Sequence, residues 1–598
     1  MSNPFSVKPP EDLTPQNIAD NFVEMYTDFP SLKEPMNLFI HGPRGAGKSI
    51  MLRSLERQVQ LLITAENREQ LPFFAIHIPI KREFFGNPEF LRLEGWKATT
   101  VGEHLLTVHA AQYLCDALFE NCVELTESSK AEFSGLWEDC GGGNDSEAIE
   151  AWNSFEDASR FCERETRRVR QYYVRLPEVG DSDVYNGALT GLSDFLLLFV
   201  RALIAEGSVK DGPVCFMVDD ADNLPEDLQR VLNSWVSARV AKLACFKVTT
   251  QLAYKTFKTM DGRIIESPHD FSEINIGSVY TSNKGNFAKR IEAIVAKRLK
   301  NAGIERSPDD FFPKDRAQQT RRDEILEDLR QGRAEPYIAL KGDGPSRSKD
   351  LAQRYAIPAL MREAAATKSA HTFSYAGLQS LTDLSSGVVR WFLQPASQMY
   401  SAVQSGIDQV DGSDKVTEIP VSVQDSEIAI WSKEFREKLN VDPGGTAGEN
   451  SRSSLQSMGH SKENYEMLGN LLDAIGAFCR ERLLDKTASE QRVFSFALND
   501  DPNRELSEIL HLGVRLGYLQ KTDLASKNTL GGRRPRYILS RRLGPHYRLD
   551  VSGYAAHLSV TCQDLTLALK DPKSFVRNRL NPAKKDDGQA TIDFGEPQ

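Results

Sequence analysis

The chain has 598 residues, 40% of them hydrophobic and 26% charged, which indicates a soluble globular protein too long for a single hydrophobic core. No apolar stretch approaches the roughly 20 residues that cross a bilayer, and the polar N-terminus lacks a signal-peptide segment, so we expect a cytoplasmic protein without membrane contact. The net charge of −11 excludes a surface coated throughout for nucleic acid, although residues 511–580 carry thirteen Lys and Arg against four Asp, a balance of +9.

The first half of the chain alternates predicted strands and helices. Apolar runs predict buried strands at residues 36–41, 73–80, 214–218 and 244–249. Helical patterns cover residues 17–27, 49–62, 101–118, 187–205 and 226–239. This alternation predicts a three-layer α/β domain with a parallel sheet, interrupted by a helical insertion at about 126–183.

The second half of the chain is predominantly helical at first and then mixed. Helices are predicted at 284–302 and between 351 and 403, with a polar insertion at about 305–347. Segments rich in Gly, Ser, Asp and Gln predict linkers around a bridging helix. These segments are 404–424 and 441–461, and the helix is 427–439. A last ordered unit covers about 463–578, and the polar tail from 581 is expected to be disordered.

A complete phosphate-binding (Walker A) pattern follows the first predicted strand. Residues Gly42, Pro43, Arg44, Gly45, Ala46, Gly47, Lys48 and Ser49 satisfy G-x-x-x-x-G-K-[ST]. Glycines let successive backbone N–H groups turn toward phosphate oxygens, and the following helix adds its positive end. We expect Lys48 to reach the β- and γ-phosphates of ATP and the Ser49 hydroxyl to bind Mg²⁺.

Two carboxylates and a polar strand end complete the predicted site. Asp219 and Asp220 end the apolar strand at 214–218 (Walker B), which places them at the carboxyl edge of the sheet. Asp219 is expected to hold Mg²⁺ and Asp220 to orient and deprotonate the attacking water. Thr250 or Gln251, at the end of the next strand, is a candidate sensor of the γ-phosphate; alternatively that strand simply ends in polar residues.

The order of these motifs resembles the AAA+ ATPases, and most of all the clade of origin-recognition and replication-licensing initiators. That clade reads Asp-Glu-x-Asp at the second motif, so the shorter Asp220 implies slow turnover, as in signalling ATPases that act as switches. The clade's lid motif, Gly-x-x-Arg at a helix start, matches Gly387 to Arg390, which implies that Arg390 is a sensor arginine. A neighbouring subunit often supplies an arginine finger, for which Arg263 and Arg290 are candidates.

The resemblance also implies a winged helix after the lid. Predicted helices at 465–484 and 504–516, a strand at 493–498 and a hairpin from 517 fit one. The hairpin is rich in arginine, and Arg533, Arg534, Arg536 and Arg541 are candidate contacts to duplex DNA. A winged helix also serves for protein docking, and the recognition helix is not strongly basic. Both alternatives remain open.

The resemblance and the element pattern divide the chain into five segments. They are a nucleotide-binding domain (1–285), a helical lid (286–402), a linker with its bridging helix (403–461), a winged-helix domain (462–580) and the tail (581–598). We expect an ATP-driven switch, in an oligomer or with a protein effector, in a mobile-element or phage-defence setting. The alternatives are a DNA-binding replication-initiator-like ATPase and an ATP-bound scaffold that does not hydrolyse.

Overall fold

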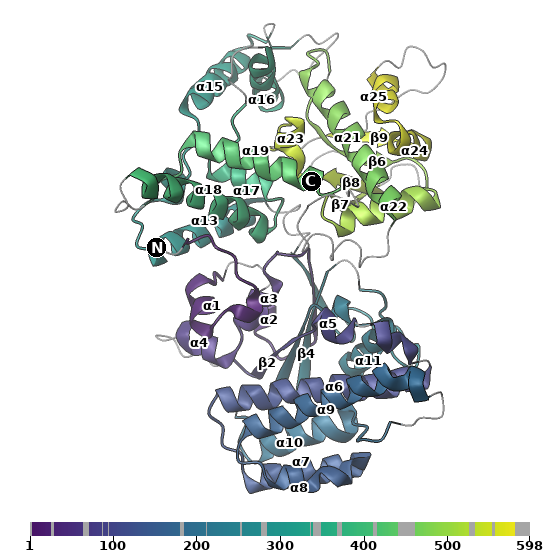
Figure 1. The fold of residues 1–598 in the computed structure, drawn as a ribbon. Helices are drawn as coiled ribbons and strands as arrows, with labels where there is room; N and C mark the ends of the chain where they lie inside the picture. Colours follow the sequence, from purple (N-terminus) through teal and green to yellow (C-terminus); the bar gives the residue numbers. More distant parts are fainter. Residues whose placement is uncertain are drawn as a thin grey trace. The chain divides into compact units, whose positions relative to one another are not determined.

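The computed structural model describes most of the chain in two compact units. The described residues are 3–24, 29–63, 71–86, 88–93, 95–179, 185–210, 212–251, 254–276, 284–334, 337–338, 348–366, 373–410, 416–440, 461–488, 490–525, 533–552 and 556–580. One unit is formed by residues 8–298, and the other by residues up to 7 together with those from 299 onward. Each unit is described by itself below (Figure 1).

A five-stranded parallel sheet forms the centre of the first unit, in the order β2-β3-β4-β1-β5. The strands are β1 (Leu38–His41), β2 (Phe74–Pro79), β3 (Val214–Asp219), β4 (Ala244–Thr250) and β5 (Ser272–Asn275). All residues of β3 and β4 are buried. Helices cover both faces of a parallel sheet, and this is why its central strands are mostly apolar. The predicted three-layer α/β domain is confirmed. The sequence reading missed the short, polar strand β5.

Helices cover both faces of this sheet. The face formed by Leu38, Ile40 and Met217 packs against α2 (Phe29–Leu32) and α3 (Lys48–Arg53). The opposite face, which includes Phe39 and Phe216, packs against longer helices. Besides α2, α3 and the insertion, the unit contains α1 (Pro15–Asn21), α4 (Arg57–Ile63), α5 (Arg82–Phe85), α6 (Trp96–Glu120), α10 (Leu197–Ala205) and α11 (Glu226–Ser237).

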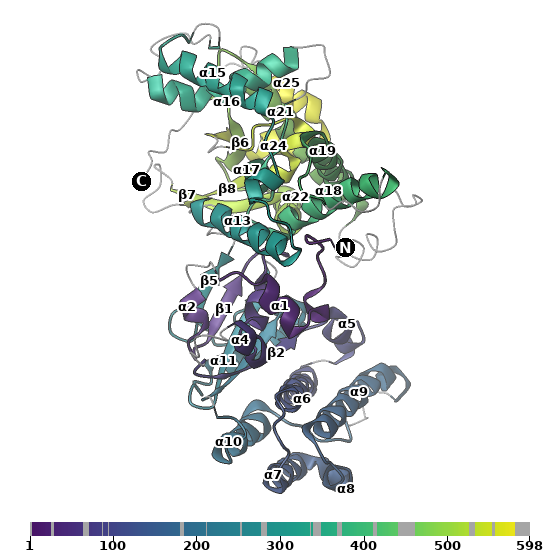
Figure 2. The same cartoon turned by 90° about the vertical axis from the view of Figure 1, so that its left-hand side faces the viewer.

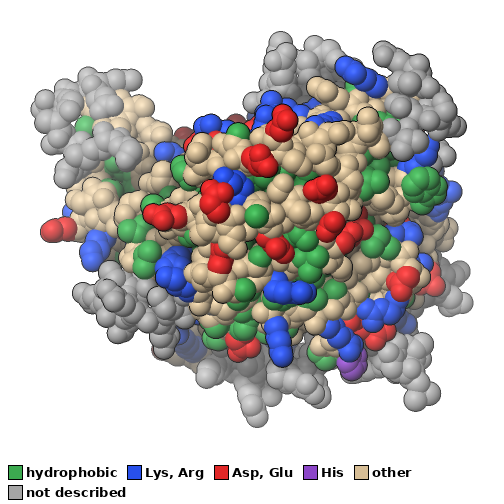
Figure 3. Space-filling model, turned by 90° about the horizontal axis from the view of Figure 1, so that it is seen from below, with side chains coloured by type: hydrophobic (Ala, Val, Ile, Leu, Met, Phe, Trp, Pro, Cys, Tyr) green, Lys and Arg blue, Asp and Glu red, His purple; other side chains and the backbone are tan. Residues whose placement is uncertain are grey.

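The segment predicted as a helical insertion folds into α7 (Glu127–Trp137), α8 (Ser146–Glu150) and α9 (Phe155–Val179). These helices gather with α6 and α10 (Figure 2), around aromatic side chains such as Phe133, Trp137 and Phe195. The same apolar cluster continues to the sheet residue Phe216, so the insertion shares the core of the unit. Its outer face mixes acidic and basic side chains (Figure 3), with exposed ion pairs one turn apart along α9.

The first part of the second unit is helical. Its helices are α14 (Pro308–Phe311), α15 (Arg316–Arg330), α16 (Ser348–Ala366), α17 (Leu378–Leu384), α18 (Val389–Val410) and α19 (Val421–Glu437). Helix α13 (Lys284–Asn301) belongs to the first unit except for its last three residues. The segment expected as a polar insertion contains the ordered helix α15, which packs on α16 through Ile325, Leu329 and Tyr355. Helix α19 begins inside the segment expected as the first linker. The second linker, 441–460, lies outside the described residues.

The last part of the second unit is a mixed α+β fold. It contains α21 (Lys462–Leu484), β6 (Val493–Leu498), α22 (Arg504–Arg515), β7 (Leu519–Ala525), β8 (Arg533–Leu539), α23 (Gly544–Tyr547), β9 (Ala556–Val560), α24 (Cys562–Lys570) and α25 (Pro572–Leu580). The sheet order is β7-β8-β6-β9, with β7 and β8 forming an antiparallel hairpin. The sequence reading missed β9. The hairpin tip, 526–532, and the tail from 581 lie outside the described residues.

None of the helices in the described part of the chain is both long enough and apolar enough to span a membrane.

Candidate functional site

The glycine-rich segment 42–47 connects β1 to α3. Gly45 and Gly47 have φ angles of 87° and 96°, a left-handed conformation that glycine adopts without steric cost. The Gly42 amide donates to the Thr250 carbonyl at 3.2 Å, which fastens the start of the loop to the end of β4. The sequence therefore places a tight loop at the carboxyl edge of the sheet, directly before the first turn of α3.

The Lys48 side chain folds back over this loop. Its ammonium group donates to the Gly42 carbonyl at 2.8 Å and to the Pro43 carbonyl at 3.2 Å, and the residue is only 5% exposed. Carbonyl oxygens compensate a buried ammonium only partly. The lysine is therefore held ready beside the loop, where an anion could take the place of the carbonyls.

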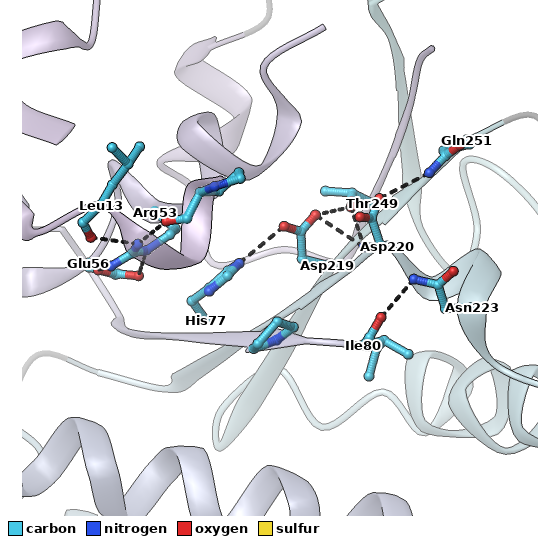
Figure 4. Close-up of polar contacts among 12 residues, drawn as sticks. Leu13, Arg53, Glu56, His77, Ile80, Asp219, Asp220, Asn223, Thr249 and Gln251 are labelled. Carbon is cyan, nitrogen blue, oxygen red and sulfur yellow. Dashed lines mark hydrogen bonds and ion pairs between the residues drawn. The ribbon is translucent and has the colours of Figure 1, made fainter. Parts of the chain in front are cut away.

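Asp219, the last residue of β3, accepts hydrogen bonds on both carboxylate oxygens (Figure 4). The Thr249 hydroxyl and the Asp220 amide (3.1 Å) donate to Oδ1, and the His77 ring lies 3.2 Å from Oδ2. Ser49 is also close enough for its hydroxyl to lower the pKa of this carboxylate. Burial opposes ionisation, but these donors outweigh it and lower the pKa of Asp219 to about 2. The carboxylate is therefore charged and fixed in orientation.

Asp220 differs from its neighbour in conformation and in charge. Its φ of 55° puts it in the left-handed region, which turns its side chain away from the line of the strand. Burial and the charge of Asp219 raise its pKa, although Lys48 and a hydrogen bond from Gln251 oppose the rise. The Gln251 amide nitrogen lies 3.4 Å from Asp220 Oδ1. The pair thus consists of one firmly ionised acid and one that takes up a proton more readily.

The two candidate sensor residues at the end of β4 face different surroundings. Gln251 contacts Asp220, as described, and its backbone amide donates to Asp222. Thr250 is fully buried, and its hydroxyl lies 2.5 Å from His41 Nδ1. Successive strand residues point to opposite faces of a sheet, so Thr249, and not Thr250, reaches the carboxylates.

The structure adds Thr249 and His77 to the residues of the site. Sequence reasoning missed both. The two adjacent threonines, Thr249 and Thr250, indicated that one of them could reach the site. Which of the two points toward the carboxylates depends on the sheet register, which the sequence alone does not give. His77 precedes Pro79, which pairs with Asp219 across β2 and β3. Nothing in the isolated sequence links His77 to a strand more than a hundred residues away.

The two arginine-finger candidates also lie in this unit. The Arg290 side chain in α13 is buried, and its guanidinium approaches the Ala46 carbonyl at 3.4 Å. Burial lowers its pKa to about 9. Arg290 therefore contacts the glycine-rich loop of its own chain, which does not suit a finger extended to a neighbour. Arg263 is half-exposed, 3.7 Å from Asp270.

A family model described as ORC-CDC6-like matches residues 3–560. The chain belongs to the ORC-CDC6-like family. This confirms the resemblance to the AAA+ initiator clade, whose members are generally ATPases. A comparison with curated proteins gives no match.

The remaining candidate residues of this ORC-CDC6-like chain lie in the second unit. Arg390 is at the start of α18, directly after a loop in which Ser386 and Gly387 both have positive φ angles. In the hairpin, Arg534 is partly exposed and donates to the Asn499 side chain at 3.5 Å. Arg536 is half-buried and donates to the Thr522 hydroxyl at 3.1 Å, and burial lowers its pKa.

The other two candidate arginines lie at the start of β8 and two residues after its end. Arg541 is largely buried and forms an ion pair with Asp383 at 3.4 Å. Arg533 begins β8, but its side chain lies outside the described residues. Of the four candidate contacts to DNA, Arg534 and Arg536 are thus both partly exposed, and Arg541 is held in an ion pair.

Proposed function

We propose that residues 42–49 bind Mg·ATP and that the chain is a slowly hydrolysing nucleotide switch. The observation that carries the proposal is the nearness of Ser49 to Asp219, which contributes to the low pKa of that carboxylate, because it brings together the two residues that the motif assigns to magnesium. Lys48 and the loop amides lie at the same sheet edge. Membership of an AAA+ family gives independent support.

The donor set at this edge fits a magnesium ion. Mg²⁺ prefers oxygen ligands and is usually bound by one or two protein groups together with substrate phosphates. Ser49 and Asp219 would supply such oxygens, and the low pKa of Asp219 keeps its negative charge available. Within the described ranges there is no group of three or more His, Cys, Asp or Glu side chains that could hold a metal ion. Phosphate oxygens and water molecules would complete the shell of a magnesium ion at this edge. Bound magnesium would neutralise charge that develops on the phosphates.

Lys48, Asp220 and Gln251 would each have a separate role in ATP hydrolysis. Lys48 would leave the carbonyls of Gly42 and Pro43 and pair with the phosphates. Asp220 would accept the proton of the attacking water, and its raised pKa makes it a better base than Asp219. Gln251 contacts Asp220 and would orient it or the water, so we favour Gln251 over the buried Thr250 as the sensor.

Slow turnover is part of the proposal. An aspartate is one methylene shorter than the glutamate usual at this position in the clade, and Asp220 is additionally bound to Gln251. The shorter Asp220 side chain must reach further toward the attacking water, and its hydrogen bond with Gln251 must break before it can accept a proton. Such a base holds the water in position less often. This supports a switch, whose output is the difference between ATP-bound and ADP-bound states. The resemblance alone carries the expectation of a mobile-element or phage-defence setting.

DNA binding through the hairpin is the second candidate function. The partly exposed Arg534 supports it, as does the local charge balance of the C-terminal segment. A winged-helix module with a basic hairpin would contact the phosphate backbone. The winged helix as a docking site for a protein effector or a second copy remains the competing proposal.

One set of assays tests these proposals together. ATP binding and phosphate release would be measured for the full chain, Lys48→Ala and Asp220→Asn, with and without duplex DNA. The switch predicts ATP binding by the wild type and by Asp220→Asn, slow phosphate release by the wild type alone, and ATP binding that is weakened about 10- to 100-fold in Lys48→Ala. Stimulation by DNA would favour the initiator-like function. Binding without any phosphate release would favour the scaffold, and absence of Mg·ATP binding would refute the assignment.

A further inference from the structure

Arg290, in helix α13, contacts the glycine-rich loop although the two are far apart in sequence. Its Nη2 atom donates to the Ala46 carbonyl at 3.4 Å, across a separation of 244 positions. The residue is 8% exposed, and burial lowers the pKa of its guanidinium to about 9. The fold therefore keeps a cation at the loop although burial disfavours the charge.

Helix α13 is fastened to the same unit at a second point. Lys297 lies about two helical turns after Arg290, on the same face of the helix. Its ammonium group donates to the Ala19 and Phe22 carbonyls at the end of α1, at 2.8 and 2.7 Å. Val295, between the two cations, is fully buried. The place of Arg290 is thus set by a helix that is packed and anchored within the unit.

The Ala46 carbonyl shares a peptide group with the Gly47 amide. In a trans peptide the C=O and N–H bonds point in opposite directions, so a group that holds the carbonyl on one side turns the amide to the other side. Gly47 has a φ angle of 96° and tolerates either orientation of this peptide, because glycine lacks a Cβ atom. A contact with the Ala46 carbonyl can therefore select the direction of the Gly47 amide.

Two cations hold different carbonyls of the loop. Lys48 contacts those of Gly42 and Pro43, and because it belongs to the loop it can turn to a bound phosphate. Arg290 comes from a separate helix and holds the Ala46 carbonyl. Carbonyls that are held by cations leave the loop amides available to an anion. A carbonyl turned toward the phosphates would instead repel them.

We propose that Arg290 is a positioning residue of the nucleotide site, which holds the Ala46 carbonyl and so directs the Gly47 amide toward the phosphates. The inference rests on the proposed nucleotide function. The phosphates that such a loop surrounds are common to ATP and ADP, so Arg290 should contribute equally to the binding of both. Without nucleotide, the same contact should keep the loop in the conformation that binds. Arg290 takes this role in place of that of an arginine finger.

Nucleotide binding and thermal unfolding of the full chain test the role. Calorimetry with Mg·ATP and with Mg·ADP would compare the wild type with Arg290→Met, which keeps an unbranched side chain and removes the charge and the donors. Both affinities should fall about tenfold, as the loss of a hydrogen bond from a charged group allows. The melting temperature should stay at or above that of the wild type, because a buried charge is removed. Arg290→Lys, which restores a charged donor, should recover part of both affinities.

The matched control is Lys289→Met, which removes the charge of the exposed neighbour on α13 and should bind both nucleotides like the wild type. Hydrogen exchange without nucleotide adds an independent readout. Peptides covering 42–51 should exchange faster in Arg290→Met than in Lys289→Met. If Arg290→Met does not fold, Arg290→Gln, which keeps an amide donor without the charge, replaces it. An equal loss of both affinities in Arg290→Gln would support the role, and no loss would refute it.

Wild-type affinities in Arg290→Met would overturn the positioning role and leave the nucleotide function in place. A loss confined to ATP would also overturn it, since Arg290 would then act on the γ-phosphate. A fall of melting temperature and affinity together, not reversed by Arg290→Lys, would show a merely structural arginine. If the wild type bound neither nucleotide, the proposed function itself would fall, and the exchange comparison would still decide whether Arg290 orders the loop.

Discussion

The contact between His77 and Asp219 gives a sharp prediction for the magnesium site. His77 Nε2 is 3.2 Å from Asp219 Oδ2, and both side chains are at least nine-tenths buried. Replacing His77 by alanine removes the partner of Oδ2 and leaves the Ser49, Thr249 and backbone donors in place. The carboxylate then gains freedom to rotate away from the orientation in which it meets the ion.

The expected size of the effect follows from similar partners in other metal sites. Loss of a hydrogen bond to a ligating carboxylate or histidine typically costs about 10- to 100-fold in metal affinity. Since other donors to Asp219 persist, we expect the lower end, about tenfold or about 1.4 kcal/mol. Nucleotide affinity at saturating magnesium should change much less.

The assay is a magnesium titration of the binding of a fluorescent ATP analogue at constant pH. His77→Ala should shift the magnesium midpoint about tenfold upward, and His77→Asn, which keeps a side-chain donor, should recover part of the shift. His269→Ala removes an exposed histidine of the same unit and serves as the control, with thermal unfolding of every variant to exclude loss of the fold. Equal or lower midpoints for His77→Ala would refute the reasoning, because the histidine would then compete with the ion for Asp219.

Four further outcomes are expected. Lys48→Ala should weaken ATP binding about 10- to 100-fold in calorimetry, since hydrogen bonds to charged groups contribute about 1.5–3 kcal/mol. Asp220→Asn should keep ATP binding but slow single-turnover hydrolysis about 100-fold or more, and unchanged turnover would remove Asp220 as the base. If the hairpin binds duplex DNA, Arg534→Ala should lower the slope of log affinity against log salt by about 1. Burial lowers the pKa of His109 from 6.5 to about 4, so the unfolded chain takes up its proton first as the pH falls. Through His109 the free energy of unfolding should therefore fall by about 2 kcal/mol from pH 7 to pH 5. In urea unfolding, His109→Gln should lack this part of the pH dependence.

How well the fold could be predicted depended on burial. β1 to β4 are apolar because both faces of the sheet are covered, and each was recognisable as a run of hydrophobic residues. β5 lies at the sheet edge beside β1, where Ser272, Glu273 and Asn275 are tolerated and no apolar run forms. α15 was taken for part of a polar insertion because only Ile325 and Leu329 of its residues are buried.

The site likewise contains residues that are adjacent in sequence and residues that only the fold brings together. The loop at 42–49 is contiguous in sequence, so its residues could be named from spacing alone. The environment of Asp219 depends on the register of three strands, which brings His77 and Thr249 to one carboxylate. Spacing also could not distinguish Arg534, which is partly exposed, from Arg541, which is paired with Asp383. A count of basic residues treats the two alike.

The N-terminal residues have a practical consequence for anyone who wishes to study the C-terminal half alone. Phe5 is completely buried in the second unit, against Phe311, Phe312 and Tyr400, and Asn3 is tied to Ser397 by two hydrogen bonds. A fragment that starts at residue 299 therefore lacks a side chain that fills its own interior. Supplying residues 3–7 as a separate peptide should raise the melting temperature of such a fragment, whereas a peptide with Phe5→Ala should not.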